Sequence, residues 1–83
     1  MNLLYFAWVR EKIGVADETV APPASVITVA DLLDWLAPKS PGHAAALADR
    51  SAIRVAIDQD FAGFDAAIAG AVEIAIFPPV TGG

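Results

Sequence analysis

A nearly unbroken apolar segment close to the C-terminus constrains the fold of this chain more than any other feature of its sequence. Residues 72–77 (Val-Glu-Ile-Ala-Ile-Phe) are apolar at every position but one. A short run of this kind is compatible with a strand at the centre of a sheet, where both faces are covered. Pro78 and Pro79 follow at once. Because proline fixes φ and lacks a backbone N–H, the strand is expected to stop there.

Three other segments have the character of strands. Residues 2–9 are rich in β-forming side chains and apolar on both alternating faces, which predicts one strand that is covered on both sides. A short strand is expected over residues 19–21, before two prolines, and residues 53–57 alternate like a half-buried strand. The polar residues 58–60 predict a turn, whereas the pattern over residues 61–64 does not identify an element.

Two helices are expected between these strands. Thr28 and Asp31 have the spacing of a capping box, in which each side chain hydrogen-bonds to the backbone of the other residue. Behind this cap, apolar residues recur at helical spacing at Val29, Leu32, Leu33 and Leu36. The pattern ends at a proline. Ser40 followed by Pro41 then predicts the start of a second, short, alanine-rich helix that runs to Asp49.

Together these elements predict an α+β fold, in which a mixed sheet is packed as a roll on one main helix with a short second helix beside it. Eighty-three residues are enough for one small domain. We therefore expect residues 1–77 to form that domain. Residues 78–83 are expected to form an extended C-terminal tail, because the two prolines favour a stiff, extended chain.

The charges and residue types exclude several classes of function. Ten acidic residues against five basic ones give a net charge of −5, which opposes binding to nucleic acids and to anionic membranes. The chain has no cysteine, and hence no disulfide, thiolate metal site or cysteine nucleophile. Its single histidine, His43, is expected at the surface or at a helix start, and Asp58 and Asp60 in an exposed turn. We expect a cytoplasmic protein without a metal site or a bound cofactor.

The chain ends in Gly82 and Gly83, and its terminal carboxylate is the best candidate for a reactive group. Glycines have no side chain, so such an end can enter a slot that would exclude other residues. The carboxylate is ionised at neutral pH and must be activated before a nucleophile attacks it. Without a nucleotide-binding motif here, a partner would have to form an acyl-adenylate from ATP. An amine would then give an isopeptide-linked modifier and a persulfide a thiocarboxylate. The residues alone leave both open, together with a plain interaction module.

Three phenylalanines form a candidate docking surface for a partner. Phe6 lies on the strand face opposite Tyr5, which we assign to the core. Phe77 directly precedes the tail, and Phe61 follows the turn over residues 58–60. The alternative is that all three belong to the core, since aromatic side chains are more often buried than exposed.

Four segments together resemble the small (sulfur carrier) subunits of molybdopterin synthase, the MoaD family. They are residues 5–11, 28–33, 55–59 and 73–83, the last ending in Phe-Pro-Pro-Val-Thr-Gly-Gly, and they follow the family order over the whole chain. The resemblance implies a ubiquitin-like β-grasp fold. Two features depart from the family pattern and leave the geometry of one turn open: Gly70-Ala71-Val72 before the last strand and Asp58 after the third.

The resemblance also implies a function and a set of partners. An adenylyltransferase of the ubiquitin-activating type would use ATP to adenylate Gly83, and a sulfur donor protein would supply the sulfur for a Gly83 thiocarboxylate. The tail would then enter the large subunit of molybdopterin synthase, in a heterotetramer of two small and two large subunits. There the sulfur would help to convert cyclic pyranopterin monophosphate into molybdopterin during molybdenum cofactor biosynthesis. The catalytic side chains would lie on the large subunit.

Individual residues receive roles from the same resemblance. Partner contacts are implied for Phe6, Arg10, Phe61 and Phe77. Insertion of the tail is implied for Pro78, Pro79, Val80, Thr81 and Gly82, which would carry Gly83 into the partner. Thiamine-pathway sulfur carriers and protein-conjugating ubiquitin-like modifiers share the fold and the diglycine end, and they are the alternatives.

Overall fold

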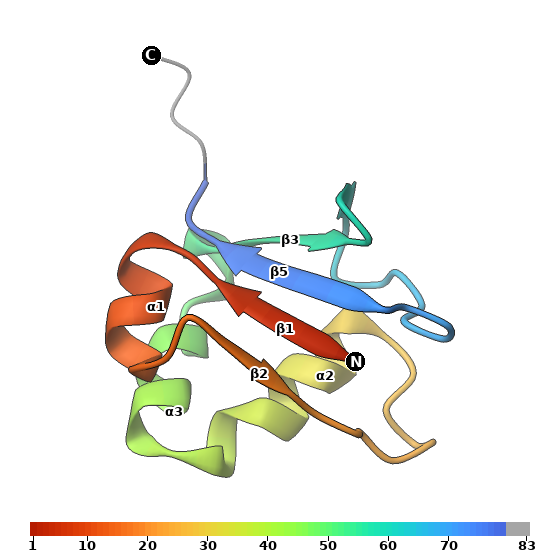
Figure 1. Ribbon diagram of the computed structural model, residues 1–83, viewed down its shortest axis with the longest axis horizontal. Coiled ribbons are helices and arrows are strands. Elements are labelled where there is room, and N and C mark those ends of the chain that lie inside the picture. Colours follow the sequence, from red (N-terminus) through yellow and green to blue (C-terminus); the bar gives the residue numbers. More distant parts are fainter. Residues whose placement is uncertain (80–83) are drawn as a thin grey trace.

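A five-stranded mixed sheet with helices packed on one face makes up the fold (Figure 1). The computed structural model describes residues 1–79; Val80, Thr81, Gly82 and Gly83 lie outside the described residues, and so do the predictions made for them. The strand order is β2-β1-β5-β3-β4. The strands are β1 (Asn2–Tyr5), β2 (Asp17–Thr19), β3 (Arg54–Ile57), β4 (Asp60–Ala62) and β5 (Glu73–Phe77).

The last strand, β5, occupies the centre of the sheet, as its apolar sequence predicts. It pairs in parallel with β1 and antiparallel with β3. Ile74 and Ile76 point to the helical side and are fully buried there. The edge strands β2 and β4 each pair antiparallel with their single neighbour.

Three α-helices cover one face of the sheet: α1 (Ala7–Ile13), α2 (Val29–Leu36) and α3 (Pro41–Leu47). Two short 3₁₀ helices, η1 (Ala37–Lys39) and η2 (Arg50–Ala52), follow α2 and α3. The apolar stripe predicted for α2 is fully buried and forms the centre of the core with the inward-facing residues of the strands. The predicted α+β roll with a mixed sheet is confirmed, with one more α-helix than the sequence indicated.

Both predicted helix starts are confirmed by their hydrogen bonds. The Asp31 N–H donates to Thr28 Oγ1 at 3.2 Å, and the Thr28 N–H donates back to Asp31 Oδ2 at 3.1 Å. The N–H of Ile27 also donates to this carboxylate, and these backbone donors lower the pKa of Asp31 because they stabilise its charged form. Ser40 accepts from the His43 N–H at 3.1 Å and starts α3. This helix ends at Leu47, two residues before the predicted end.

The prediction of one strand over residues 2–9 is wrong beyond Tyr5. The chain turns at Phe6 into α1, and Ala7 adopts a positive φ of 53° at the junction. Tertiary packing overrides the local preference here, because the helix packs on α3 and buries Val9 fully. A close approach makes that packing possible: a Cβ on Gly42 of α3 would lie 2.2 Å from the Lys12 carbonyl oxygen.

Two smaller predictions also differ from the structure. The second strand is β2 over Asp17–Thr19, two residues earlier than the predicted 19–21. Residues 60–62, partly in a segment to which the sequence assigned no element, form β4 at the edge of the sheet. A three-residue edge strand has too short a pattern to be identified from alternation alone.

Candidate functional site

The base of the predicted tail lies at the middle of the sheet, where β5 ends. Tyr5 of β1 is in register with Ile76, and Arg54 of β3 is in register with Phe77. The Phe6 N–H donates to the Ile76 carbonyl at 3.2 Å and continues the β1–β5 contact past the end of β1. The chain therefore leaves the domain from a strand that is held on both sides, as Figure 1 shows.

The three phenylalanines of the candidate docking surface surround this exit. Phe6 is 48% exposed and Phe61 is 82% exposed, while Phe77 is half-buried. The rings of Phe61 and Phe77 lie with their centroids 5.8 Å apart. The prediction that they lie outside the buried core is confirmed, and their role in binding a partner stays a prediction. We call Phe6, Phe61 and Phe77 the aromatic surface.

The alternation of β5 explains why part of this surface is open. Ile74 and Ile76 face the helices, so Ala75 and Phe77 face the opposite side of the sheet, which carries no helix. A shallow hollow of about 370 Å³ lies here. Its lining residues are Arg54, Val55, Phe61, Ala62 and Phe77. A partly apolar hollow beside the tail exit is suited to receive an apolar side chain of a partner.

Two arginines bring positive charge to this end of an acidic chain. Arg54 lines the hollow, and its guanidinium donates to the carbonyls of Ile53 at 2.9 Å and Ser51 at 3.2 Å, which fixes its direction. Arg10, which the sequence assigned to the partner interface, is exposed on the first helix. Either guanidinium can form an ion pair with a carboxylate of a partner.

Within residues 1–79 the candidate site contains no metal-binding group of side chains. No cluster of three or more His, Cys, Asp or Glu side chains in this range could hold a metal ion. None of the helices described here has the length and apolar character needed to cross a membrane. The proposed reactive group, the carboxylate of Gly83, lies outside the described residues.

The two departures from the family pattern, Asp58 and the segment 70–72, are in contact through a hydrogen bond. Asp58 and Gln59 form the turn between β3 and β4 with positive φ angles of 48° and 74°. Asp58 Oδ1 accepts from the N–H groups of Val72 at 3.0 Å and Glu73 at 2.9 Å. The turn predicted over residues 58–60 is confirmed in its first two residues. Aspartate tolerates this backbone conformation. Its contact with Val72, fourteen positions later, could not be recognised from the neighbouring sequence.

His43 lies at a helix start, as predicted, but it is not a surface residue. It is only 7% exposed and is the one buried polar residue among those described. Its ring nitrogens contact Glu18 and Ser40, and Glu18 also accepts from the Tyr5 hydroxyl. Burial, followed by the neighbouring Glu18, raises the pKa of Tyr5. No local pattern indicates this cluster, because it joins residues from separate elements.

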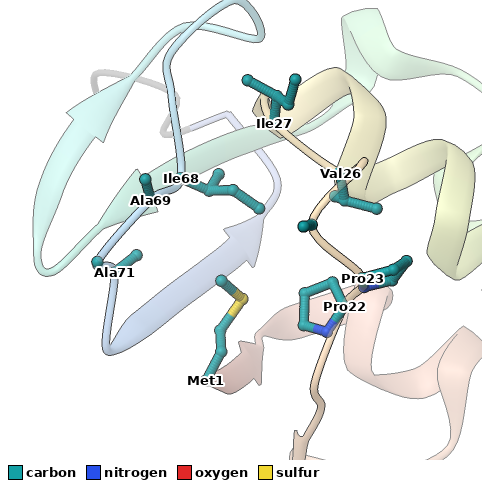
Figure 2. A pocket seen from close by; sticks show the side chains of 10 residues that line it. Met1, Pro22, Pro23, Val26, Ile27, Ile68, Ala69 and Ala71 are labelled. Carbon is teal, nitrogen blue, oxygen red and sulfur yellow. The ribbon is translucent and has the colours of Figure 1, made fainter.

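A second hollow, of about 380 Å³, lies at the opposite end of the sheet from the tail exit (Figure 2). Met1, two prolines and the segment that leads to α2 form one side, and residues 68–71 form the other. All of its lining side chains are uncharged, and most are apolar. This hollow offers no chemically reactive side chain.

Comparisons with known proteins extend over the whole chain. A model of the ThiS family matches residues 3–83. The molybdopterin synthase sulfur carrier subunits of Haemophilus influenzae and Escherichia coli are 37% and 39% identical to this chain over 83 residues. In both cases the match covers 100% of this chain and 99% of the relative.

Two solved structures have the same fold. SAMP1 from Haloferax volcanii has a TM-score of 0.72 at 32% identity, and the match covers 100% of this chain and 98% of that chain. The putative molybdopterin converting factor, subunit 1, from Pyrococcus furiosus has a TM-score of 0.69 over 95% of each chain. Its 20% identity makes it a comparison of folds alone. These likenesses confirm the β-grasp fold that the resemblance implied.

Proposed function

The chain belongs to the ThiS family, and we propose that it is the sulfur carrier subunit of a molybdopterin synthase. One structural observation carries this proposal: the central strand β5 leads directly into Pro78 and Pro79 with Phe6 and Phe61 exposed around the exit. A partner that draws in the tail must also cover this surface. The relatives with 37% and 39% identity over the full length are carriers of this kind.

The chemistry of the carrier takes place on the carboxylate of Gly83. Attack of this carboxylate on the α-phosphorus of ATP forms an acyl-adenylate and releases pyrophosphate. A persulfide sulfur of a donor protein then attacks the acyl carbon and AMP leaves, and reductive cleavage of the acyl persulfide by a thiol yields the thiocarboxylate. An adenylyltransferase of the ubiquitin-activating type would bind the ATP, so this chain needs no nucleotide site of its own.

The loaded tail would then deliver sulfur inside the large synthase subunit. Gly82 would provide the narrow backbone that a closed channel requires, and residues 78–81 would supply the reach, since six extended residues span roughly 20 Å. The aromatic surface and Arg10 would dock on the large subunit, in a heterotetramer of two small and two large subunits. The side chains that act on the pterin substrate would belong to the large subunit.

A second candidate function is attachment to other proteins through an isopeptide bond. One observation favours it: a Haloferax volcanii neighbour at 31% identity is described as small archaeal modifier protein 1. Both functions use the same acyl-adenylate and differ in the nucleophile that follows. A lysine amine would give the conjugate, whereas a persulfide would give the carrier.

Intact mass spectrometry separates the two candidates. The chain is incubated with its adenylyltransferase, ATP and a persulfide donor, in the presence of a reducing thiol. The carrier function predicts a mass gain equal to the replacement of one oxygen by sulfur, and loss of that product when Gly83 is deleted. Conjugates to lysines without a sulfur-loaded form would favour the modifier, and a chain that is never adenylated would contradict both.

A further inference from the structure

His43 of α3 belongs to a polar site that joins this helix to the strands β1 and β2. Its side chain is 9% exposed. Nε2 lies 2.7 Å from Glu18 Oε2, and Nδ1 lies 2.7 Å from Ser40 Oγ. Both ring nitrogens therefore have a partner at short distance. Glu18 belongs to β2, and Ser40 is the N-cap of α3, the helix that carries His43.

Glu18 is the centre of this site. Its Oε2 also accepts from the Tyr5 hydroxyl at 2.7 Å, and its Oε1 lies 3.7 Å from Lys39 Nζ. The Tyr5 ring meets the His43 ring edge-on, with centroids 6.2 Å apart. One carboxylate thus connects β1, β2, η1 and α3. Within residues 1–79, the ion pairs to Glu18 come from Lys39 and His43, and neither α1 nor α2 contributes a charged side chain to them.

The donors and acceptors define how protons are arranged when His43 is neutral. An ionised carboxylate only accepts hydrogen bonds, so Nε2 must carry the proton that points to Glu18. Nδ1 is then an acceptor, and the Ser40 hydroxyl donates to it. Ser40 Oγ at the same time accepts from the His43 backbone N–H. Every polar atom of the site is satisfied, and no buried side-chain N or O in residues 1–79 lacks a hydrogen bond.

The same heavy atoms can hold one more proton. If Nδ1 is protonated, it becomes a donor, and Ser40 Oγ can accept from it because a hydroxyl oxygen has two lone pairs. The hydroxyl hydrogen rotates away and no heavy atom has to move. Charging a buried imidazole is costly unless an opposite charge lies beside it. Glu18 supplies that charge at 2.7 Å.

We propose that Ser40, His43 and Glu18 form a proton-binding site inside the fold, in which His43 takes up a solvent proton at Nδ1 and Glu18 serves as its counter-ion. The charged pair then fastens α3 to β1 and β2 through the Tyr5 and Lys39 contacts of the same carboxylate. The counter-ion keeps the fold stable when the buried ring is charged.

The state of Glu18 supports this role. Burial acts to raise the pKa of its carboxyl, but the hydrogen bonds from His43 and Tyr5, with the charges of His43 and Lys39, lower it overall. The carboxylate therefore stays ionised while His43 changes charge. Removal of its charge should matter little when His43 is neutral and much more when His43 is protonated.

The test measures urea unfolding of the full chain at about pH 8 and about pH 5.5, which bracket the charge change of histidine. Glu18→Gln keeps the size and the acceptor oxygen but removes the charge. Its effect on the folding equilibrium constant should be at least about tenfold larger at the lower pH. The matched control is Asp17→Asn, which changes the adjacent exposed carboxylate on β2. It should change the folding equilibrium constant by the same factor at both pH values. The pH dependence of Glu18→Gln should disappear in a His43→Gln background.

A pH-independent effect of Glu18→Gln, or a pH dependence that persists without His43, would overturn the proposal. If Glu18→Gln does not fold, NMR of the wild-type chain decides, because its single histidine gives one set of imidazole signals. The neutral ring should be the Nε2–H tautomer, and the amide hydrogens of α3 should stay protected once the ring is doubly protonated. Loss of that protection when the ring is protonated would show that the charge is expelled and refute the site.

Discussion

The ring centroids of Phe61 and Phe77 lie 5.8 Å apart, so the most exposed large hydrophobic side chain among the described residues lies against the residue from which the tail departs. Phe61 belongs to an edge strand and Phe77 to the central strand, with β3 between them. This pair places an apolar contact beside the end of β5, from which the tail departs. A partner that binds the tail would therefore also bury the apolar surface of both rings.

Phe61→Ala should weaken binding to the large subunit by about 2 kcal/mol or more, as expected of an interface hot spot. Its effect on the stability of the isolated chain should stay within about 0.5 kcal/mol, because Phe61 is 82% exposed. Titration calorimetry and urea unfolding measure the two quantities. Val72→Ala, which removes an exposed apolar residue at the other end of β5, is the control and should leave the affinity unchanged. Normal affinity of Phe61→Ala would exclude the aromatic surface as the docking site.

Gly82→Val should reduce turnover of the assembled synthase strongly while the melting temperature of the free chain stays constant. The branched side chain adds volume and restricts φ where a partner is proposed to close around the backbone. Ala69→Val, which adds a similar volume at an exposed position of the domain, should retain activity. Unchanged turnover of Gly82→Val would mean that the partner does not enclose the tail tightly.

Gly42→Ala should destabilise the fold by about 1–3 kcal/mol. The added Cβ would lie 2.2 Å from the Lys12 carbonyl oxygen and 3.2 Å from the Ile13 Cα, so α1 and α3 must move apart. This outcome reverses the usual gain of about 1 kcal/mol from replacing glycine within a helix. Ala45→Gly, at an exposed position of α3, tests helix propensity alone. A Gly42→Ala variant more stable than wild type would contradict the close packing of the two helices.

Stability should decline on acidification below about pH 4.5. The pKa values of Glu18 and Asp31 are both lowered in the folded chain, from reference values of 4.5 and 3.8. A lowered pKa means that the unfolded chain binds protons first, so the stabilisation is complete above the reference value and is lost as the pH falls through the folded one. Urea midpoints measured across this range should fall less steeply in Glu18→Gln and Asp31→Asn. If both variants show the same slope as the wild-type chain, groups other than Glu18 and Asp31 cause the acid sensitivity.

The parts of the fold that the sequence predicts well are set by near neighbours. The cap formed by Thr28 and Asp31 requires only residues three positions apart, and the apolar run of β5 carries its own signal of burial. The exposed position of Phe6 follows from its alternation with Tyr5, although the strand that suggested this alternation ends one residue earlier.

The parts that the sequence does not predict depend on distant contacts. Trp8 and Val9 favour a strand locally, and only the contact of α1 with α3 makes them helical. His43 and Glu18 are twenty-five positions apart, and neither has a neighbour in sequence that indicates the other. Their pairing becomes visible only when β2 and α3 are placed side by side.

The position of β5 also has a mechanical consequence. A force applied through Pro79 runs along the strand, so the hydrogen bonds to β1 and β3 on its two edges must resist it together in shear. An edge strand could instead be peeled away one bond at a time. A partner that pulls on the tail is therefore expected to move the domain as one folded unit, without unfolding β5.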